Sequence, residues 1–217
     1  MDLVHPEAER YAAEHTSGPD EVVAALRRET EATMRAPQMA GGTVEVKLLE
    51  ALVTATRASR VLEIGTFTGV GAISMASRLA PGGRLLTIEA DPAHAEVARR
   101  HIEASPVADR IEVLLGDALE LVATLEGPFD VVFVDAWKTD YPAYYEAVVP
   151  KLAPNGVLVA DNVLRGGSVL THDPADESAV ALRAFADRAL ADPRVDCALL
   201  TVGDGLLLVW PRTEATA

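Results

Sequence analysis

VLEIGTFTGVG, the stretch at residues 61–71, decides the fold. Its first four residues are apolar except for Glu63, which is typical of a strand covered on both faces. Glycines follow at once and open a helix, and glycines in such a turn let the backbone approach a ligand closely. In α/β sheets, ligands bind outside the carboxyl ends of the strands, near the point where the strand order reverses. We therefore expect a ligand site directly after this strand.

Short apolar runs alternate with helical segments through the rest of the chain. We predict strands at 61–64, 84–88, 111–115, 131–134, 157–160, 195–200 and 206–209. We predict helices between them at 72–79, 92–104, 118–125, 141–152 and 178–191. Such alternation gives a parallel sheet with helices on both faces. The Asp204-Gly205 pair between the last two strands indicates a hairpin. The expected fold class is α/β: a Rossmann-like, doubly wound, mostly parallel seven-stranded sheet with an antiparallel C-terminal hairpin strand.

The N-terminal segment has no strand pattern. Its periodicity predicts helices at 20–34 and 43–57, joined by a flexible stretch at 37–42. A length of 217 residues is consistent with one domain. We expect a single domain over 1–217, with a helical cap at 1–58 and a Rossmann-like core at 59–217.

The charge of the chain restricts its partners. It has 19 Lys and Arg residues against 33 Asp and Glu residues, and a formal net charge of −14. Such a surface repels phosphate backbones, which makes nucleic acid an unlikely partner. The single cysteine, Cys197, cannot form an intrachain disulfide, which is consistent with a reducing compartment. Since no secretory signal and no apolar run of membrane-spanning length is visible, we expect a cytoplasmic protein without membrane contacts.

Acidic residues stand at three successive strand ends. Glu63 can pair with an ammonium group, and Glu89 can accept hydrogen bonds from ribose hydroxyls. Asp117 can accept from an adenine amino group, while the small Ala118 leaves room for a flat base. The glycine order is G-x-x-x-G-x-G, whereas dinucleotide-binding turns have G-x-G-x-x-G. This set indicates S-adenosylmethionine better than a dinucleotide.

Oxygen donors gather at the ends of the fourth and fifth predicted strands. Asp135 follows one strand, and Asp161 and Asn162 end the other. Two carboxylates and an amide, without His or Cys nearby, favour a hard cation such as Mg²⁺, with Mn²⁺ or Ca²⁺ as alternatives. Lys138 lies three residues after Asp135, where it could act as a base beside the cation.

The motifs together resemble the small cation-dependent O-methyltransferases, the family of the catechol and caffeoyl-CoA O-methyltransferases. The likeness runs from about Met39 to the C-terminus and rests on Glu-Ile-Gly before Phe-Thr-Gly, on Phe-Val-Asp-Ala-x-Lys-x-x-Tyr, and on Asp-Asn-x-Leu. It implies catalytic roles for Lys138 and Asp135 and metal ligation by Asp135, Asp161 and Asn162. It implies homodimers in which N-terminal helices help to cover the site. The implied cofactor contacts are Met39, Gly41, Glu63, Gly65, Thr66, Gly71, Glu89, Asp117, Ala118 and Asp135.

Three positions depart from the family pattern. Gly71 stands where a serine often contacts the cofactor carboxylate, so that a backbone contact is expected there. Trp137 and Arg165 replace residues near the expected acceptor pocket, so the resemblance does not carry the acceptor over. The expected activity is methyl transfer from S-adenosylmethionine to a hydroxyl of a small catechol-like or phenolic acceptor.

Three alternatives stay open. Methylation of a hydroxylated uridine in tRNA is possible within the same family, with Arg57, Arg60, Arg99 and Arg100 as a local basic patch. An NAD(P)-dependent oxidoreductase would share the sheet and the acid for the ribose. A binding module without catalysis is the third alternative.

Overall fold

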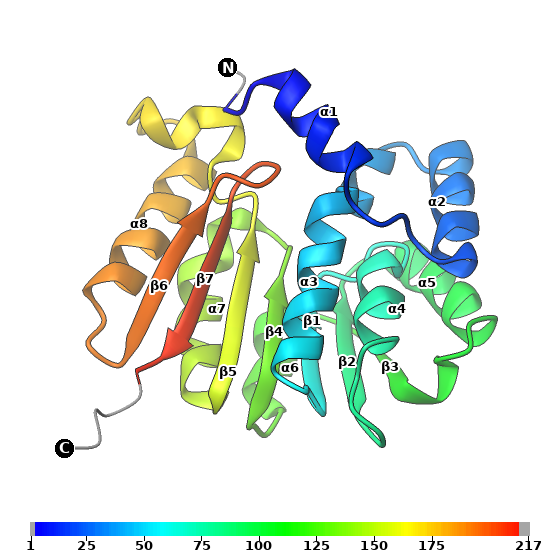
Figure 1. The fold of residues 1–217 in the computed structure, drawn as a ribbon. Coiled ribbons are helices and arrows are strands. Elements are labelled where there is room, and N and C mark those ends of the chain that lie inside the picture. Colours follow the sequence, from blue (N-terminus) through cyan, green and yellow to red (C-terminus); the bar gives the residue numbers. More distant parts are fainter. Residues whose placement is uncertain (1–2, 213–217) are drawn as a thin grey trace.

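Helices enclose a mixed β-sheet in the computed structural model, which describes residues 3–212 (Figure 1). The strands are β1 (Arg60–Ile64), β2 (Arg84–Glu89), β3 (Ile111–Leu115), β4 (Phe129–Val134), β5 (Leu152–Asp161), β6 (Val195–Leu200) and β7 (Leu206–Pro211). The α-helices are α1 (Pro6–Glu14), α2 (Glu21–Thr33), α3 (Thr43–Ala55), α4 (Val70–Ala76), α5 (Pro92–Glu103), α6 (Ala118–Thr124), α7 (Tyr141–Val148) and α8 (Glu177–Ala191). Short 3-10 turns at Pro37–Ala40, Lys138–Asp140 and Arg165–Leu170 border the site described below.

The strand order confirms the predicted doubly wound sheet. Within the described residues the sheet has seven strands in the order β3-β2-β1-β4-β5-β7-β6. The first five strands in the chain are parallel, and β7 is antiparallel to both of its neighbours, β5 and β6. Figure 1 shows β7 pointing opposite to the others. The strand order reverses between β1 and β4, which places the expected ligand site there.

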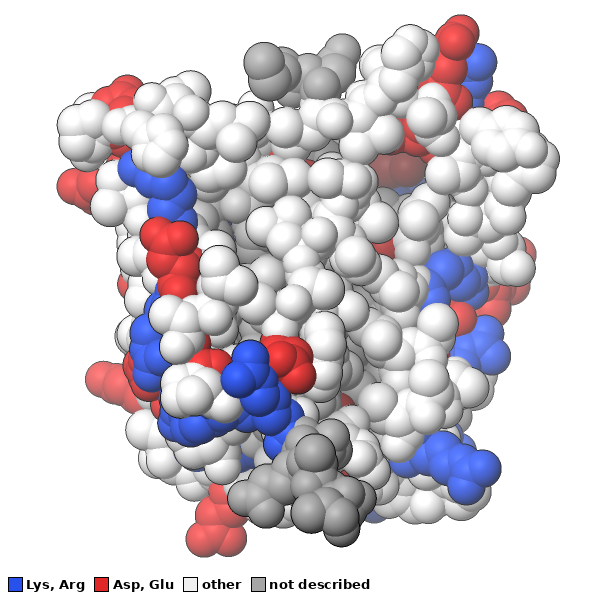
Figure 2. Space-filling view, turned by 60° about the vertical axis from the view of Figure 1, so that its left-hand side comes forward, with Lys and Arg blue, Asp and Glu red and all other residues white. Residues whose placement is uncertain are grey.

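Two apolar clusters fill the space on either side of the sheet. One joins α2, α3, α4 and α5 to the sheet, and the other joins α6, α7 and α8 to its opposite face. No helix of the described residues covers the near face of β6 and β7 in Figure 1. Figure 2 shows this side of the molecule with its charged side chains mostly around a broad uncharged area. One part of the sheet therefore keeps an open face.

The N-terminal helices are attached to the core by polar contacts. Thr30 on α2 donates a hydrogen bond of 3.0 Å to Thr68 in the glycine turn, and both side chains are buried. Arg27 on α2 donates to the carbonyl of Gly41 at 2.8 Å. Glu29 forms an ion pair with Arg100 on α5, and its Oε2 lies 3.1 Å from Nε2 of His101 on the same helix. These contacts hold the segment around residue 41 over the carboxyl ends of the strands.

Two boundary predictions are wrong. Strand β5 begins at Leu152 rather than at 157, because Pro154, Asn155 and Gly156 continue the strand through an irregularity in its pairing with β4. The preceding helix therefore ends at Val148, where Pro150 follows, and does not reach 152.

The sequence pattern does not predict helix α1. This helix buries none of its residues and so leaves no periodic apolar signal.

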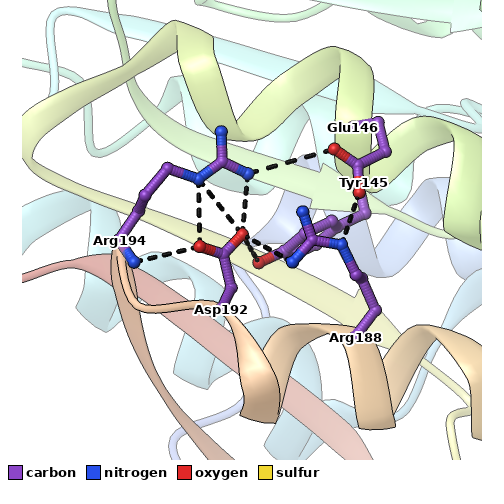
Figure 3. Close-up of polar contacts among 5 residues, drawn as sticks. All are labelled: Tyr145, Glu146, Arg188, Asp192 and Arg194. Atoms are coloured by element: carbon purple, nitrogen blue, oxygen red, sulfur yellow. Dashed lines mark hydrogen bonds and ion pairs between the residues drawn. The ribbon is translucent and has the colours of Figure 1, made fainter.

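A buried carboxylate fixes the end of α8. Asp192 is 2% exposed and forms ion pairs with Arg188 and Arg194, and Tyr145 on α7 donates to it at 2.9 Å (Figure 3). Both arginines also pair with Glu146. Hydrogen bonds from Arg194 hold the pKa of Asp192 well below its ordinary value. The network joins α7, α8 and the start of β6.

No helix among residues 3–212 combines the length and the apolar character needed to cross a membrane.

Candidate active site

An open cavity of about 740 Å³ lies at the carboxyl ends of the five parallel strands β1 to β5. Gly65, Glu89, Asp117, Asp135 and Asp161 mark these strand ends, one from each strand. The structure brings every residue of the expected site to this cavity: Met39, Gly41, Glu63, Gly65, Thr66, Gly71, Glu89, Asp117, Ala118, Asp135, Lys138, Asp161 and Asn162. One cavity therefore contains both the predicted cofactor set and the predicted metal set.

Gly65 joins the tips of β1 and β4. Its φ of 100° lies in the left-handed region, and a Cβ at this position would collide with the carbonyl oxygen of Asp135. The Gly65 amide donates to Ile88 at 2.9 Å, and the Asp135 amide donates to Ile64 at 2.8 Å, so strand pairing continues past the strand ends. A glycine is required here because the backbone segments after β1 and after β4 approach so closely.

Glu63 is a buried carboxyl group at the floor of the cavity. It is 1% exposed, and Thr87 donates a hydrogen bond of 2.5 Å to it. Thr66 and Thr87 share a further hydrogen bond of 2.5 Å. Burial raises the pKa of Glu63 to about 8, and the charges of Asp135 and Glu89 act in the same direction. This group can take up or release a proton near neutral pH, and its carboxylate form would accept an ammonium partner.

Gly71 lies directly against the Glu63 side chain. A Cβ at residue 71 would overlap Oε1 of the Glu63 side chain. The buried carboxylate thus occupies the space that a serine would need in this arrangement.

Glu89 is held by two backbone amides. Phe67 donates to Oε2 at 2.7 Å, and Asp91 donates to Oε1 at 2.9 Å. Phe67 has a φ of 49°, which is uncommon for a residue other than glycine, and its ring packs edge-on against His94. Each oxygen of a carboxylate can accept more than one hydrogen bond. Glu89 therefore retains acceptor capacity for hydroxyl groups in the cavity.

Asp117 combines a structural contact with a place in the cavity. Its Oδ1 accepts from the amide of Glu120 at 3.0 Å and so caps α6. Hydrogen bonding by a capping residue explains the helix start. Ala118 beside it is half-buried and lines the same cavity.

The tips of β4 and β5 bring the predicted metal ligands together. Val134 pairs with Ala160 in the register, so Asp135 and Asp161 follow at neighbouring positions. Asp161 is 2% exposed and accepts from the amide of Asn162 at 2.5 Å. Burial, together with the neighbouring carboxylates of Glu45 and Asp135, raises the pKa of Asp161 to about 9. Charged groups buried in this way need a compensating charge.

The donor set is compatible with a hard cation. Within residues 3–212, no three His, Cys, Asp or Glu side chains lie close enough to hold a metal ion by themselves. The predicted set differs in that the Asn162 amide supplies one of its three donors. Its oxygen ligands match the preference of Mg²⁺. A divalent cation there would compensate the buried carboxylate of Asp161.

Lys138 is held at the edge of this set. Its Nζ donates to Oδ1 of Asp135 at 2.8 Å and to the hydroxyl of Tyr141 at 2.7 Å. The Tyr141 hydroxyl also lies 2.9 Å from the carbonyl oxygen of Asp161, so it connects Lys138 to β5. Burial raises the pKa of Tyr141, which keeps its hydroxyl protonated as a donor.

Sequence reasoning missed Glu45. This residue lies on α3, is 7% exposed, and lines the cavity near Asp161. Its Oε2 accepts from the amide of Gly42 at 3.3 Å, and burial raises its pKa. The available signal was an acidic residue between Val44 and Val46. The cap helix therefore adds a carboxyl group that the strand-end pattern does not predict.

Comparison with protein families gives one match over nearly the whole chain. The profile described as O-methyltransferase matches residues 13–212. The chain belongs to the O-methyltransferase family. Catechol O-methyltransferase of Mycobacterium tuberculosis is 38% identical over 213 residues, which are 95% of this chain and 96% of that protein. The expected resemblance to the catechol and caffeoyl-CoA O-methyltransferases is confirmed.

Solved structures of related O-methyltransferases share the fold. TomG from Streptomyces achromogenes, involved in tomaymycin synthesis and solved in complex with SAM, has a TM-score of 0.87 and 32% identity, covering 95% of this chain and 96% of its own. The O-methyltransferase from Bacillus cereus, solved with SAH, has a TM-score of 0.87 and 32% identity, covering 95% and 97%. These likenesses favour the transferase over the oxidoreductase and the binding module.

Two of the three positions at which this O-methyltransferase departs from the family pattern lie at the cavity. Trp137 is 77% exposed and lines the cavity next to Lys138. Arg165 also lines it and forms an ion pair of 3.1 Å with Asp176. Both side chains belong to turns that follow β4 and β5.

Proposed function

We propose that this O-methyltransferase transfers the methyl group of S-adenosylmethionine to a hydroxyl of a small catechol-like or phenolic acceptor, with the help of a divalent cation such as Mg²⁺. One observation carries the proposal: Glu63 and Glu89 share a cavity with Asp135, Asp161, Asn162 and Lys138. The SAM and SAH complexes of TomG and of the Bacillus cereus enzyme support the cofactor. The name of the Mycobacterium tuberculosis relative supports the acceptor class.

The strand-end residues would orient the cofactor. Glu63 would accept from its ammonium group, and Glu89 would accept from its ribose hydroxyls while its own oxygens stay fixed by Phe67 and Asp91. Asp117 would accept from the adenine amino group beside Ala118. Met39 and Gly41 approach the cavity from the cap, where Arg27 holds the Gly41 carbonyl. Fixed orientation of the two reactants supplies a large part of such a rate enhancement.

Asp135, Asp161 and Asn162 would hold the cation, which supplies a Lewis acid that lowers the pKa of the acceptor hydroxyl. Phenols have an ordinary pKa of about 10, like tyrosine, so their proton must be removed during the reaction. Lys138 would take this proton as its neutral amine. Its hydrogen bonds to Asp135 and Tyr141 fix the position of Nζ at the edge of the cation site.

The metal requirement is tested with labelled cofactor and a catechol. We expect EDTA-treated protein to lose turnover and added Mg²⁺ to restore it. Calorimetry with Mn²⁺ should show binding to the unmodified protein and much weaker binding to Asp161→Asn. Full turnover by EDTA-treated protein would refute cation assistance, whichever acceptor is used.

The role of Lys138 is tested by two substitutions. Lys138→Ala should reduce turnover by about 10²- to 10⁴-fold, the usual contribution of a general base, and SAH affinity should change much less. Lys138→Arg keeps a positive charge beside Asp135 but stays protonated, so it should be equally impaired. Lys47→Ala, outside the cavity, is the control. Recovery of turnover in the arginine variant would show that Lys138 only positions Asp135.

A further inference from the structure

A second cavity, of about 320 Å³, lies at the opposite edge of the sheet, at the amino ends of β1, β2 and β3. Three arginines line it: Arg60, Arg84 and Arg110. Its remaining lining is mostly apolar and includes Leu86 and Phe129. The catalytic residues discussed above do not line this cleft.

The sheet register places the three arginines in a row. Arg60 and Arg84 are direct partners in the pairing of β1 with β2. Leu85 pairs with Ile111, so Arg110 lies next to Arg84 in the following strand position. Neighbouring strands lie about 4.8 Å apart, and the row therefore spans about 10 Å at the backbone.

The positive charge of the row is poorly compensated. Within residues 3–212, none of the three arginines forms an ion pair with a carboxylate. Arg60 donates instead to the carbonyls of Gly127 and Glu126, at 3.1 and 2.8 Å, and its guanidinium lies 5.0 Å from the centre of the Phe129 ring. Glu112 is the acidic residue in the lining.

The neighbouring acid Asp130 forms no ion pair with the row among residues 3–212, and its Oδ2 accepts from the amides of Ser59 and Arg60 and from the Ser59 hydroxyl. Three adjacent guanidinium groups repel one another, and the protein as a whole carries a net charge of −14. Such a concentration of positive charge in an acidic protein favours an anionic ligand at this one place.

We propose that this cleft binds the diphosphate group of a small ligand. Guanidinium groups form paired hydrogen bonds with phosphate oxygens. Because the Arg60 guanidinium already donates to two carbonyls, Arg84 and Arg110 would supply these pairs. Two linked phosphates present more acceptor oxygens along the row than a single tetrahedral oxyanion does, so a diphosphate can engage more of its guanidinium groups. The apolar lining beside Leu86 offers a surface for an attached organic group.

The site is separate from the cofactor cavity. Strands β1 and β2 have five and six residues, and a strand rises about 3.3 Å per residue, so the two cavities lie about 15–20 Å apart along the sheet. A ligand in the arginine cleft should therefore bind together with SAH.

The test is calorimetry with inorganic pyrophosphate at low ionic strength, on the full chain with and without saturating SAH. We expect pyrophosphate to bind equally well in both cases, at least about tenfold more tightly than phosphate or sulfate, and more weakly as salt is added. The double variant Arg84→Gln/Arg110→Gln should weaken binding by at least about tenfold. Comparison of pyrophosphate with ADP distinguishes free diphosphate from a nucleotide as the natural source.

The control variant is Arg99→Gln/Arg183→Gln. These two arginines also donate to backbone carbonyls and lie outside the cleft. The control should bind pyrophosphate normally. Absence of pyrophosphate binding, competition with SAH, or equal binding by both double variants would overturn the proposal. Much tighter binding of a short RNA than of pyrophosphate or ADP would also overturn it, in favour of a nucleic-acid surface.

Discussion

At the scale of single residues, the cavity holds ionisable groups at positions where water cannot solvate their charged forms fully. Glu63 is the clearest case, because its pKa of about 8 arises mainly from burial and leaves the carboxyl group neutral at pH 7 in the free protein. An ammonium partner needs the carboxylate form. Binding of such a partner must therefore release a proton.

This coupling predicts a pH-dependent affinity. SAH carries the ammonium group, so its affinity should fall as the pH decreases from about 8, by up to tenfold for each unit. Calorimetry in buffers of different ionisation enthalpy should show proton release at pH 7. Glu63→Gln cannot release this proton, and its affinity should be lower and less dependent on pH. An identical pH profile for both proteins would contradict the ammonium contact.

Gly71 gives a second prediction at this scale. In Gly71→Ala, the new Cβ collides with Oε1 of Glu63, which must leave its position beside Thr87. We expect SAH affinity to fall by about tenfold, which corresponds to about 1.4 kcal/mol. Gly18→Ala is the matched control, since a Cβ there meets no atom within 4 Å. Unchanged affinity in Gly71→Ala would show that Glu63 moves at no cost.

At the scale of elements, ion pairs fix the ends of helices that carry no catalytic residue. Asp192 connects the end of α8 to α7 through Tyr145 and two arginines (Figure 3). Its lowered pKa means that the folded state prefers the ionised form. The stabilisation is therefore complete above the unfolded pKa of about 4 and is lost as the pH falls below it.

Substitution of Asp192 tests this contribution. Asp192→Asn should lower the free energy of unfolding at pH 7 by about 1–3 kcal/mol, the usual loss for hydrogen bonds to a charged group. Both arginines are partly exposed, so water compensates part of the loss. Urea unfolding at several pH values should show that the difference in free energy of unfolding between the two proteins becomes smaller below about pH 4. Asp187→Asn, which is exposed on the same helix, should leave stability unchanged.

The sequence predicted the elements that follow its strongest patterns. Continuous apolar runs such as 131–134 are strands, and the acids that follow them reach one cavity because parallel strands end at one edge. The start of β5 was not predictable, since Pro154 and Gly156 indicate a turn in isolation and only the pairing with β4 extends the strand. Glu45 was missed for a related reason, because its place near Asp161 depends on how α3 packs rather than on a local motif.

At the scale of the whole molecule, the open face of β7 and β6 is the feature that packing within one chain does not account for (Figure 1). Trp210 on β7 is 37% exposed, and Leu208 on the same face is half-buried. Figure 2 shows a broad uncharged area on this side. Exposed apolar surface of this kind is typical of an interface. We expect the homodimer predicted from the family resemblance to use this face.

Trp210→Asp tests that expectation. A two-fold axis through the expected interface would repeat the introduced charge in both subunits, so the change should convert a dimer into a monomer in light scattering. Val180→Asp, on an exposed position of α8, is the control and should leave the dimer intact. A dimer that persists in the Trp210 variant with a normal thermal transition would place the interface elsewhere.

The position of β7 between β5 and β6 has a consequence for synthesis on the ribosome. Strand β7 follows β6 in the chain but fills an interior slot of the sheet, so neither β5 nor β6 has its full set of partners until residues 206–211 emerge. Until then, the nascent chain presents two unpaired strand edges. Chaperones that shield such edges would be engaged longest at this final stage, and premature termination before β7 would release an aggregation-prone product.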